Sequence, residues 1–290
     1  MDELPNGVLI HILQYIGTAK EVSELRRVCK LWKELSVECV VSYKREYTDL
    51  VNISLLSELK SLTELYLFNN RIVDLGPLSG LRSLTYLNLS CNKIEDITPI
   101  SELKSLIYLS LRSNKIEDED ITPLSKLSSL TCLDLSENYI VDFTPLTELK
   151  SLTWLDLYDN GIVDITPLSE MKSLIKLWLS SNKIVDITPI SKLKLTCLDL
   201  NNNKIVDITP LSGLKTLKHL YLNNNKIEDI TALSGLKSLT HLHLHCNKIV
   251  DITPISEMRL SLLELITYNN KIVGGETFRY QFNHTAFSIF

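Results

Sequence analysis

The pattern LxxLxLxxNxIxDIxPL recurs ten times between Leu59 and Ile272, and it constrains the fold more than any other feature of this chain. Its asparagines recur at a period of about 22 residues, which is typical of stacked repeat proteins. A repeat this short cannot bury its own leucines, so each repeat must stack on its neighbours. The pattern predicts one solenoid whose long surface favours recognition of another macromolecule. The asparagines are Asn70, Asn92, Asn114, Asn138, Asn160, Asn182, Asn203, Asn225, Asn247 and Asn270.

Each repeat contains an alternating apolar segment, as in Leu62, Leu65 and Leu67 of the first repeat. Such alternation predicts a short strand, and stacking would place the strands of successive repeats side by side in parallel. The inward leucines would form the core. Each asparagine side chain, with two donors and an acceptor, would satisfy the backbone of the turn that leaves the strand. We therefore predict an α/β solenoid with a parallel β-sheet on its concave face.

The DITPL segment that follows each strand, as in Asp96 to Ile100, places a threonine before a proline. This order predicts an N-cap at the threonine, followed by a short helix or 3₁₀ turn on the convex side. The aspartates form a column that could suggest calcium. We favour turn capping, because a lysine or arginine three residues earlier in most repeats offsets the repulsion. The column is Asp74, Asp96, Asp118, Asp142, Asp164, Asp186, Asp207, Asp229 and Asp251.

Residues 1–46 follow a different pattern. Apolar residues recur at helical spacing at Val8, Leu9, Ile12, Leu13 and Ile16, and again from Leu25 to Leu35. Thr18 and Glu21 form a capping box that begins the second helix. We predict a small all-α domain over residues 1–46, the repeat solenoid over 47–273 and a C-terminal cap over 274–290. The aromatic residues of the cap would cover the open end of the core and the exposed edge of the sheet.

The N-terminal segment resembles an F-box: Leu4-Pro5, the helix from Val8 and the segment from Arg26 to Trp32 match that family in order and spacing. The resemblance implies binding to the Skp adaptor of a cullin-type ubiquitin ligase, with a protein substrate captured by the downstream repeats. Asn6-Gly7 departs from the pattern, which often has an acidic residue there, and glycine in a first helical turn costs up to about 1 kcal/mol relative to alanine. The implied adaptor contacts are Leu4, Pro5, Val8, Leu9, Ile12, Leu13, Val28, Cys29 and Trp32.

The repeats themselves resemble the 22-residue leucine-rich repeats of internalins and of the regulatory repeat protein of type 1 phosphatase. Leucine-rich repeats also occur downstream of F-boxes, so the two halves of the chain agree. Repeat class determines the scaffold but not the partner. The alternative is therefore a protein-interaction scaffold outside any ligase, of the phosphatase-regulatory or internalin-like kind, in which the N-terminal helices only cap the first repeat.

Positions six, four and two residues before each asparagine would point outward from the strand, onto the concave face. They hold nine aromatic residues, a type that strands favour but that also dominates interface hot spots. We predict a substrate face centred on Trp154, Tyr158 and Trp178. The acidic balance of Asp134, Asp156 and Asp199 around Lys176 favours a basic peptide or patch on the partner. The predicted contacts are Tyr66, Phe68, Tyr86, Tyr108, Trp154, Asp156, Tyr158, Lys176, Trp178, Tyr221 and His243.

Four histidines gather on this predicted face. His241, His243 and His245 project from one strand, and His219 would lie opposite His241. Strand spacing would bring neighbours within about 5 to 7 Å, close enough for two or three of them to share a zinc ion. Exposed polar strand residues are common, and no metal-binding motif accompanies these. We therefore favour a polar or pH-sensitive part of the binding face, and we predict no metal and no cofactor.

Several classes of function and location are disfavoured. The net charge is −5 and the lysines are spread through the repeats, so no basic stripe predicts nucleic-acid binding. Asp2 and Glu3 precede an interrupted apolar run, so we expect neither an export signal nor a membrane span. The six cysteines include no CxxC pair, which favours free thiols in a reducing compartment. The chain is expected to be intracellular, in the cytoplasm or the nucleus.

No catalytic constellation is present in the sequence. It has no glycine-rich phosphate loop, no GxSxG and no HExxH motif. We therefore predict a non-enzymatic adaptor that acts as a monomer within a hetero-complex, binding the Skp adaptor at one end and a protein substrate on the repeats.

Overall fold

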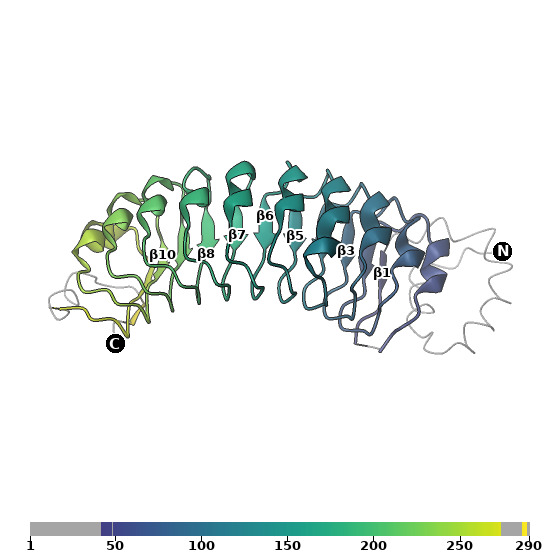
Figure 1. Cartoon of the computed structure of the whole chain (residues 1–290), viewed down its shortest axis with the longest axis horizontal. Coiled ribbons are helices and arrows are strands. Elements are labelled where there is room, and N and C mark those ends of the chain that lie inside the picture. The colour runs from purple at the N-terminus through teal and green to yellow at the C-terminus, as the bar shows by residue number, and fades with distance from the viewer. Residues whose placement is uncertain (1–41, 48, 274–285, 289–290) are drawn as a thin grey trace, which may run out of the picture. The chain divides into compact units, whose positions relative to one another are not determined.

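The computed structural model describes residues 42–47, 49–273 and 286–288 (Figure 1). The chain divides into two compact units, Met1–Asn138 and Tyr139–Phe290. The predicted helical domain lies outside the described residues up to position 41, and with it lie all nine predicted adaptor contacts. These contacts therefore remain predictions.

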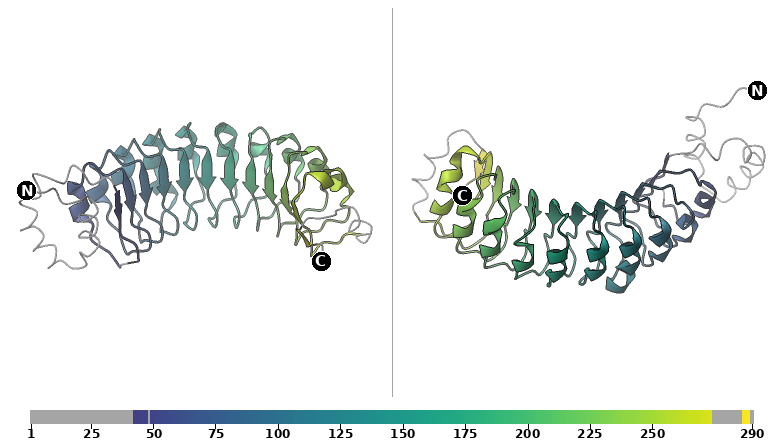
Figure 2. Two further views of the ribbon diagram at one scale, coloured as in Figure 1. Left: turned by 180° about the vertical axis from the view of Figure 1, so that it is seen from behind. Right: turned by 90° about the horizontal axis from the view of Figure 1, so that it is seen from above.

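The first unit is a parallel sheet whose strands follow the order of the chain. Its 3₁₀-helices lie on the other side of each repeat from the strands (Figure 2). The strands are β1 (Ser42–Lys44), β2 (Glu64–Tyr66), β3 (Tyr86–Asn88), β4 (Tyr108–Ser110) and β5 (Cys132–Asp134). The 3₁₀-helices are η2 (Ser54–Glu58), η3 (Gly76–Leu78), η4 (Thr98–Glu102) and η5 (Asp118–Lys126).

The second unit repeats this architecture, again with parallel strands in chain order. Its strands are β6 (Trp154–Asp156), β7 (Lys176–Trp178), β8 (Cys197–Asp199), β9 (His219–Tyr221), β10 (His241–His243), β11 (Glu264–Ile266) and β12 (Ala286–Ser288). Its 3₁₀-helices are η6 (Thr144–Glu148), η7 (Thr166–Glu170), η8 (Thr188–Ile190), η9 (Thr209–Gly213), η10 (Thr231–Gly235) and η11 (Thr253–Leu260). β12, from the segment predicted as the cap, pairs with β11.

The first strand lies within the range that the sequence assigned to the helical domain. β1 pairs in parallel with β2, with Ser42 opposite Glu64 and Lys44 opposite Tyr66. The sheet therefore begins before residue 47, the predicted start of the solenoid. The segment Ser-Tyr-Lys lacks the LxL signature of the later strands, so its pairing was not visible in the sequence pattern.

The inward leucines form a continuous core within each unit. Leu65, Leu87 and Leu109 are fully buried and lie opposite one another on β2, β3 and β4. The DITPL segments add a second buried row, which includes Ile97 and Ile100. Burying an aliphatic side chain of this size contributes roughly 1.5–3 kcal/mol. The predicted leucine-rich solenoid with a parallel sheet is confirmed.

The buried asparagines act as predicted. Asn92 Nδ2 donates to the carbonyls of Leu67 (3.0 Å), Leu89 (2.9 Å) and Ser90 (3.2 Å), and its Oδ1 accepts the amide of Ile72 at 2.9 Å. Each such side chain therefore closes its own turn and also bonds the preceding repeat.

The helix starts correct one prediction. Thr98 is the first residue of η4 and not its N-cap; the N-cap is Ile97, which has no side-chain cap bond. Asp96 Oδ1 instead accepts the Thr98 amide at 2.7 Å. The Thr98 hydroxyl and, after it, this amide lower the pKa of Asp96 by their hydrogen bonds to the carboxylate. Eight aspartates of the column accept the amide two residues later, so turn capping is confirmed for them. Asp118 is the exception, because it is the first residue of η5, and Glu117 is the N-cap there. An aspartate two residues before the helix can accept its first free amide, so the threonine is not needed for this.

The longest 3₁₀-helix of the described chain is η5, and a capping box of Glu117 and Asp120 begins it. The spacing from Asn114 to Asn138 is 24 residues, because Glu119 and Asp120 are extra residues in this repeat, and both lie in η5. In the part of the chain that the structure describes, no helix is both long and apolar enough to cross a membrane.

Cys91, Cys132, Cys197 and Cys246 are free thiols.

Candidate protein-interaction face

In each unit, the strand residues that alternate with the buried leucines form a second surface. We call the ten repeat asparagines, from Asn70 to Asn270, the asparagine ladder. We call the second surface the strand face, and it consists of the side chains two, four and six residues before each asparagine of this ladder. On β3, for example, Tyr86 and Asn88 are half-buried while Leu87 between them is buried. All the predicted substrate contacts occupy this face. Many of them lie in an aromatic stack, a tryptophan pair and a histidine cluster. A polar network of other residues lies beside the aromatic stack.

The aromatic stack runs across the first unit. The Tyr66 and Tyr86 ring centroids lie 4.7 Å apart, and the Tyr86 and Tyr108 rings stack at 4.3 Å with an interplanar angle of 2°. Phe68 meets Tyr47 edge-on at 4.9 Å. Burial raises the pKa of Tyr108, and the neighbouring Tyr86 raises it further, so this phenol stays neutral. The stack is a preformed apolar strip with hydroxyl groups.

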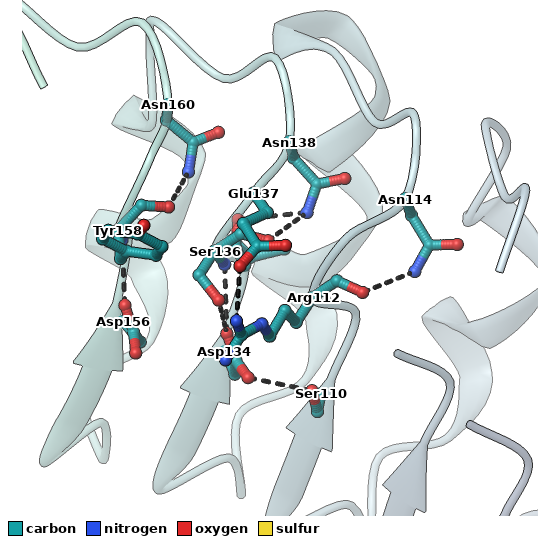
Figure 3. A network of polar contacts seen from close by, with 11 residues as sticks. Ser110, Arg112, Asn114, Asp134, Ser136, Glu137, Asn138, Asp156, Tyr158 and Asn160 are labelled. Atoms are coloured by element: carbon teal, nitrogen blue, oxygen red, sulfur yellow. Dashed lines mark hydrogen bonds and ion pairs between the residues drawn. The ribbon is translucent and has the colours of Figure 1, made fainter. Parts of the chain in front are cut away.

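The polar network follows the stack on β4 and β5 (Figure 3). Asp134 accepts the Ser110 hydroxyl at 3.0 Å, the Ser136 hydroxyl at 2.6 Å and the Ser136 amide at 3.0 Å. Arg112 forms an ion pair with Glu137. Burial disfavours the charged guanidinium, but Glu137 and Asp134 favour it, and the pKa of Arg112 is raised. The guanidinium of Arg112 therefore pairs with Glu137, and the negative charge of Asp134 favours it further.

The tryptophan pair lies in the second unit. The rings of Trp154 and Trp178 are 5.0 Å apart and tilted by 48°. Trp178 is in register with Asp156 on one side and with Asp199 on the other. Lys176 is in register with Trp154. The structure thus brings Trp154, Asp156, Lys176, Trp178 and Asp199 together. Asp134 belongs to the first unit, and the bond given for Tyr158 is that of its backbone amide to Asp156.

Both aspartates beside Trp178 have backbone partners. Asp156 Oδ1 accepts the Tyr158 amide at 2.8 Å, and Asp199 Oδ1 accepts the Asn201 amide at 2.9 Å. Asp199 Oδ2 accepts the Ser180 hydroxyl at 3.1 Å. Burial nevertheless raises the pKa of Asp199 overall. Burial also raises the pKa of the Cys197 thiol to about 11, so this cysteine is not an activated nucleophile.

The histidine cluster lies on β9 and β10 and at His245, two residues after β10. His219 and His241 stack at 4.5 Å, His243 meets Tyr221 edge-on at 4.8 Å, and His245 stacks on Tyr268 at 4.5 Å. No three potential metal ligands converge among the residues that the structure describes.

Glu264 is a residue of this cluster that the sequence reasoning missed. Its Oε1 lies 3.1 Å from His243 Nε2, and its Oε2 lies 3.9 Å from His241 Nε2. Counting six residues back from Asn270 would have placed Glu264 opposite His241. The imidazoles therefore interact with a carboxylate and with each other's rings.

Comparison with known families accounts for these features. The family model "Leucine Rich repeats (2 copies)" matches residues 60–102, 104–148, 150–192, 193–235 and 215–257. The chain belongs to the leucine-rich-repeat family. The model "F-box-like" matches residues 1–47 of this leucine-rich-repeat protein, and the first repeat match begins at residue 60. Both predicted resemblances are confirmed.

Solved structures support the same fold. An internalin from Listeria monocytogenes has a TM-score of 0.73 and 25% sequence identity, over 91% of this chain and 93% of that chain. A leucine-rich-repeat protein from Leptospira interrogans has a TM-score of 0.66 and 24% identity, over 80% of this chain and 74% of that chain, and this likeness shows the fold alone. Among proteins with curated descriptions, none matches this leucine-rich-repeat protein.

Proposed function

We propose that this leucine-rich-repeat protein is a substrate receptor of a Skp–cullin–F-box type ubiquitin ligase. The observation that supports the proposal is the direct junction of the two modules. The F-box-like match ends at residue 47, and β1, within that match, already pairs with the first full repeat. The F-box-like segment would bind the Skp adaptor, and the strand face would bind a protein substrate.

The mechanism needs no chemistry from this chain. Binding a substrate on one module and the ligase on the other raises their effective concentration and orients them. A junction without a linker would keep the substrate at a constant distance from the adaptor. The ubiquitin-transfer step would then belong to the conjugating enzyme held by the cullin, and this protein would act as a non-enzymatic monomer of a hetero-complex in the cytoplasm or nucleus.

Titration calorimetry with the purified Skp adaptor tests the proposal. We expect saturable binding by the full chain, and at least a tenfold loss in the triple variant Leu4→Ala, Pro5→Ala, Trp32→Ala. Circular dichroism and a thermal melt of this variant show whether the repeats stay folded. Trp178→Ala is the matched control, because it removes a large aromatic side chain from the strand face and should leave adaptor binding unchanged. Absence of binding by the intact chain overturns the proposal.

The likeness to an internalin over 91% of this chain favours a second candidate, a protein-interaction scaffold outside any ligase. In that case the N-terminal segment would only cap the first repeat, which every solenoid requires. The two candidates differ in the same titration: a scaffold would not bind the Skp adaptor, and its triple variant would lose stability of the first repeats instead.

A further inference from the structure

Three side chains stand in register on neighbouring strands of the second unit. Asp156 on β6 lies opposite Trp178 on β7, and Trp178 lies opposite Asp199 on β8. Paired strands are separated by about 4.8 Å, so a carboxylate flanks the indole on each side. All three side chains are half-buried, and Trp154 packs against Trp178 at 5.0 Å. The row therefore offers an aromatic ring between two anions.

At Asp199 the fold uses the oxygen atoms of the carboxylate, which accept the Asn201 amide and the Ser180 hydroxyl. Asp156 and Asp199 each accept the amide two residues later in the chain. In the first unit, Asn88 makes the same bond to the Ser90 amide at 3.0 Å with a neutral side-chain oxygen. An asparagine would thus satisfy the backbone equally well. At Asp199 the charge is also costly, since burial raises its pKa.

The first unit shows what such a carboxylate does with a cation nearby. Asp134 occupies the same repeat position, and the guanidinium of Arg112 lies beside it, paired with Glu137 (Figure 3). No lysine or arginine of the described chain forms an ion pair with Asp199. Burial raises the pKa of Asp199 more than its hydrogen bonds and the nearby His243 side chain lower it. A bound cation would supply beside Asp199 the positive charge that Arg112 supplies in the first unit.

We infer that the row Asp156–Trp178–Asp199 is a subsite for an arginine side chain of the protein partner. A guanidinium is planar, so it can stack on the indole while donating N–H bonds to a carboxylate at its edge. Lysine has no planar group and fits this row less well. The inference rests on the proposed function only in taking the strand face as the substrate-binding surface, and it defines the substrate as one that presents an arginine.

Lys176 opposes cation binding and makes the inference sharper. It lies on β7 two residues before Trp178, in register with Trp154 and Cys197, and its side chain is exposed. Lys176 belongs to the row next to Asp156–Trp178–Asp199, and its charge repels any basic residue of the partner that would lie over that next row. The subsite should therefore accept a single arginine and not a run of basic residues. Removing this charge should strengthen arginine binding, a gain that a folding defect cannot imitate.

The test uses the full chain and two synthetic peptides, acetyl-Gly-Gly-Arg-Gly-Gly-amide and the same peptide with citrulline in place of arginine. Citrulline keeps the shape of arginine without the charge. We expect saturable quenching of tryptophan fluorescence and a calorimetric signal with the arginine peptide, and at least tenfold weaker binding of the citrulline peptide. Equal binding of the two peptides, or no binding of either, overturns the inference.

Variants locate the subsite. Asp156→Asn with Asp199→Asn should weaken arginine-peptide binding at least tenfold with an unchanged thermal melt, whereas Lys176→Gln should tighten it two- to threefold. Asp229→Asn is the matched control, because Asp229 also accepts a backbone amide two residues on but lies outside the strand face. Unchanged binding by the double variant overturns the inference. If that occurs while Skp binding persists, the proposed function stands; lost Skp binding with intact arginine binding overturns only that function.

Discussion

Asn92 Oδ1 accepts a 2.9 Å hydrogen bond from the backbone amide of Ile72, one repeat earlier in the chain. The same bond recurs between Asn114 and Ile94 at 3.0 Å. Because the side chain also donates to carbonyls of both repeats, it replaces backbone hydrogen bonds that neither the short strand nor the short helix can make. The stacking of repeats depends on these polar bonds as well as on the leucine core.

We expect Asn92→Ala to lower the free energy of unfolding by about 2–4 kcal/mol. The change leaves the Ile72 amide and buried carbonyls without partners, and each such group costs about 1–3 kcal/mol. Asn92→Asp should be at least as damaging, because it places an anion against carbonyl oxygens. Urea denaturation measures both effects. Lys93→Ala, at the exposed neighbouring position, should stay within about 0.5 kcal/mol of wild type; a similarly small change for Asn92→Ala would contradict the bonding role.

We expect Ser181→Gly to stabilise the protein by about 0.5–1 kcal/mol. Ser181 precedes a ladder asparagine and has a φ of 55°, a left-handed conformation that side chains disfavour and glycine tolerates. Ser181→Val should destabilise it by about 1–2 kcal/mol for the same reason. Thermal melts of the two variants should therefore shift in opposite directions. Lys183→Gly, where φ is not positive, serves as the control and should be destabilising.

We expect the stability of the second unit to decline as the pH falls below about 6.5. Burial, together with His241, Lys176 and Lys218, lowers the pKa of His219, while burial and His243 lower that of His245. The unfolded chain therefore binds protons at a higher pH than the folded chain. The stabilisation that comes from keeping these two imidazoles neutral is complete above the unfolded pKa of about 6.5. It is lost as the pH falls through the pKa values of the folded state.

Urea midpoints between pH 7.5 and 5 measure this dependence. The double variant His219→Gln, His245→Gln should flatten the slope. Asp229→Asn should leave this range unchanged, because the pKa of Asp229 is lowered from 3.8 and acts only in stronger acid. A slope that persists in the histidine variant would assign the effect to other groups.

We expect Trp154→Ala with Trp178→Ala to weaken substrate capture about 30-fold or more, while binding to the Skp adaptor stays intact. Loss of a hot-spot aromatic residue typically costs 2 kcal/mol or more of binding free energy, which corresponds to about 30-fold. Affinity purification from cells, compared between wild type and variant, measures the capture. Val163→Ala with Val185→Ala, two exposed positions outside the strand face, is the control. Equal capture by the tryptophan variant would place the substrate site elsewhere.

The fold was largely predictable because each repeat contains the same local sequence pattern. Leu65 and Asn92 are buried, as their repeat positions required. The predicted threonine N-cap was wrong, since the capping oxygen belongs to Asp96, two residues earlier. β1 was missed because its residues do not carry the repeat signature, and only its pairing with β2 identifies it as a strand.

The candidate site was predicted as a set of residues but not as a set of contacts. Tyr66, Tyr86 and Tyr108 were assigned to one face by counting back from the asparagines, and they do form a stack. Glu264 was missed, although it approaches both His241 and His243. The choice among side-chain rotamers depends on the neighbouring strands, so the count alone could not show it.

The sequence by itself determined the repeat, the inward leucines and the asparagine ladder, because periodic burial and hydrogen-bonding needs are written into every 22-residue unit. Tertiary structure decided which residues of different repeats meet. Asp156, Trp178 and Asp199 are far apart in the chain and become neighbours only through the register of β6, β7 and β8. That register results from backbone hydrogen bonds between the strands. These bonds do not depend on the chemistry of the side chains that they place opposite one another.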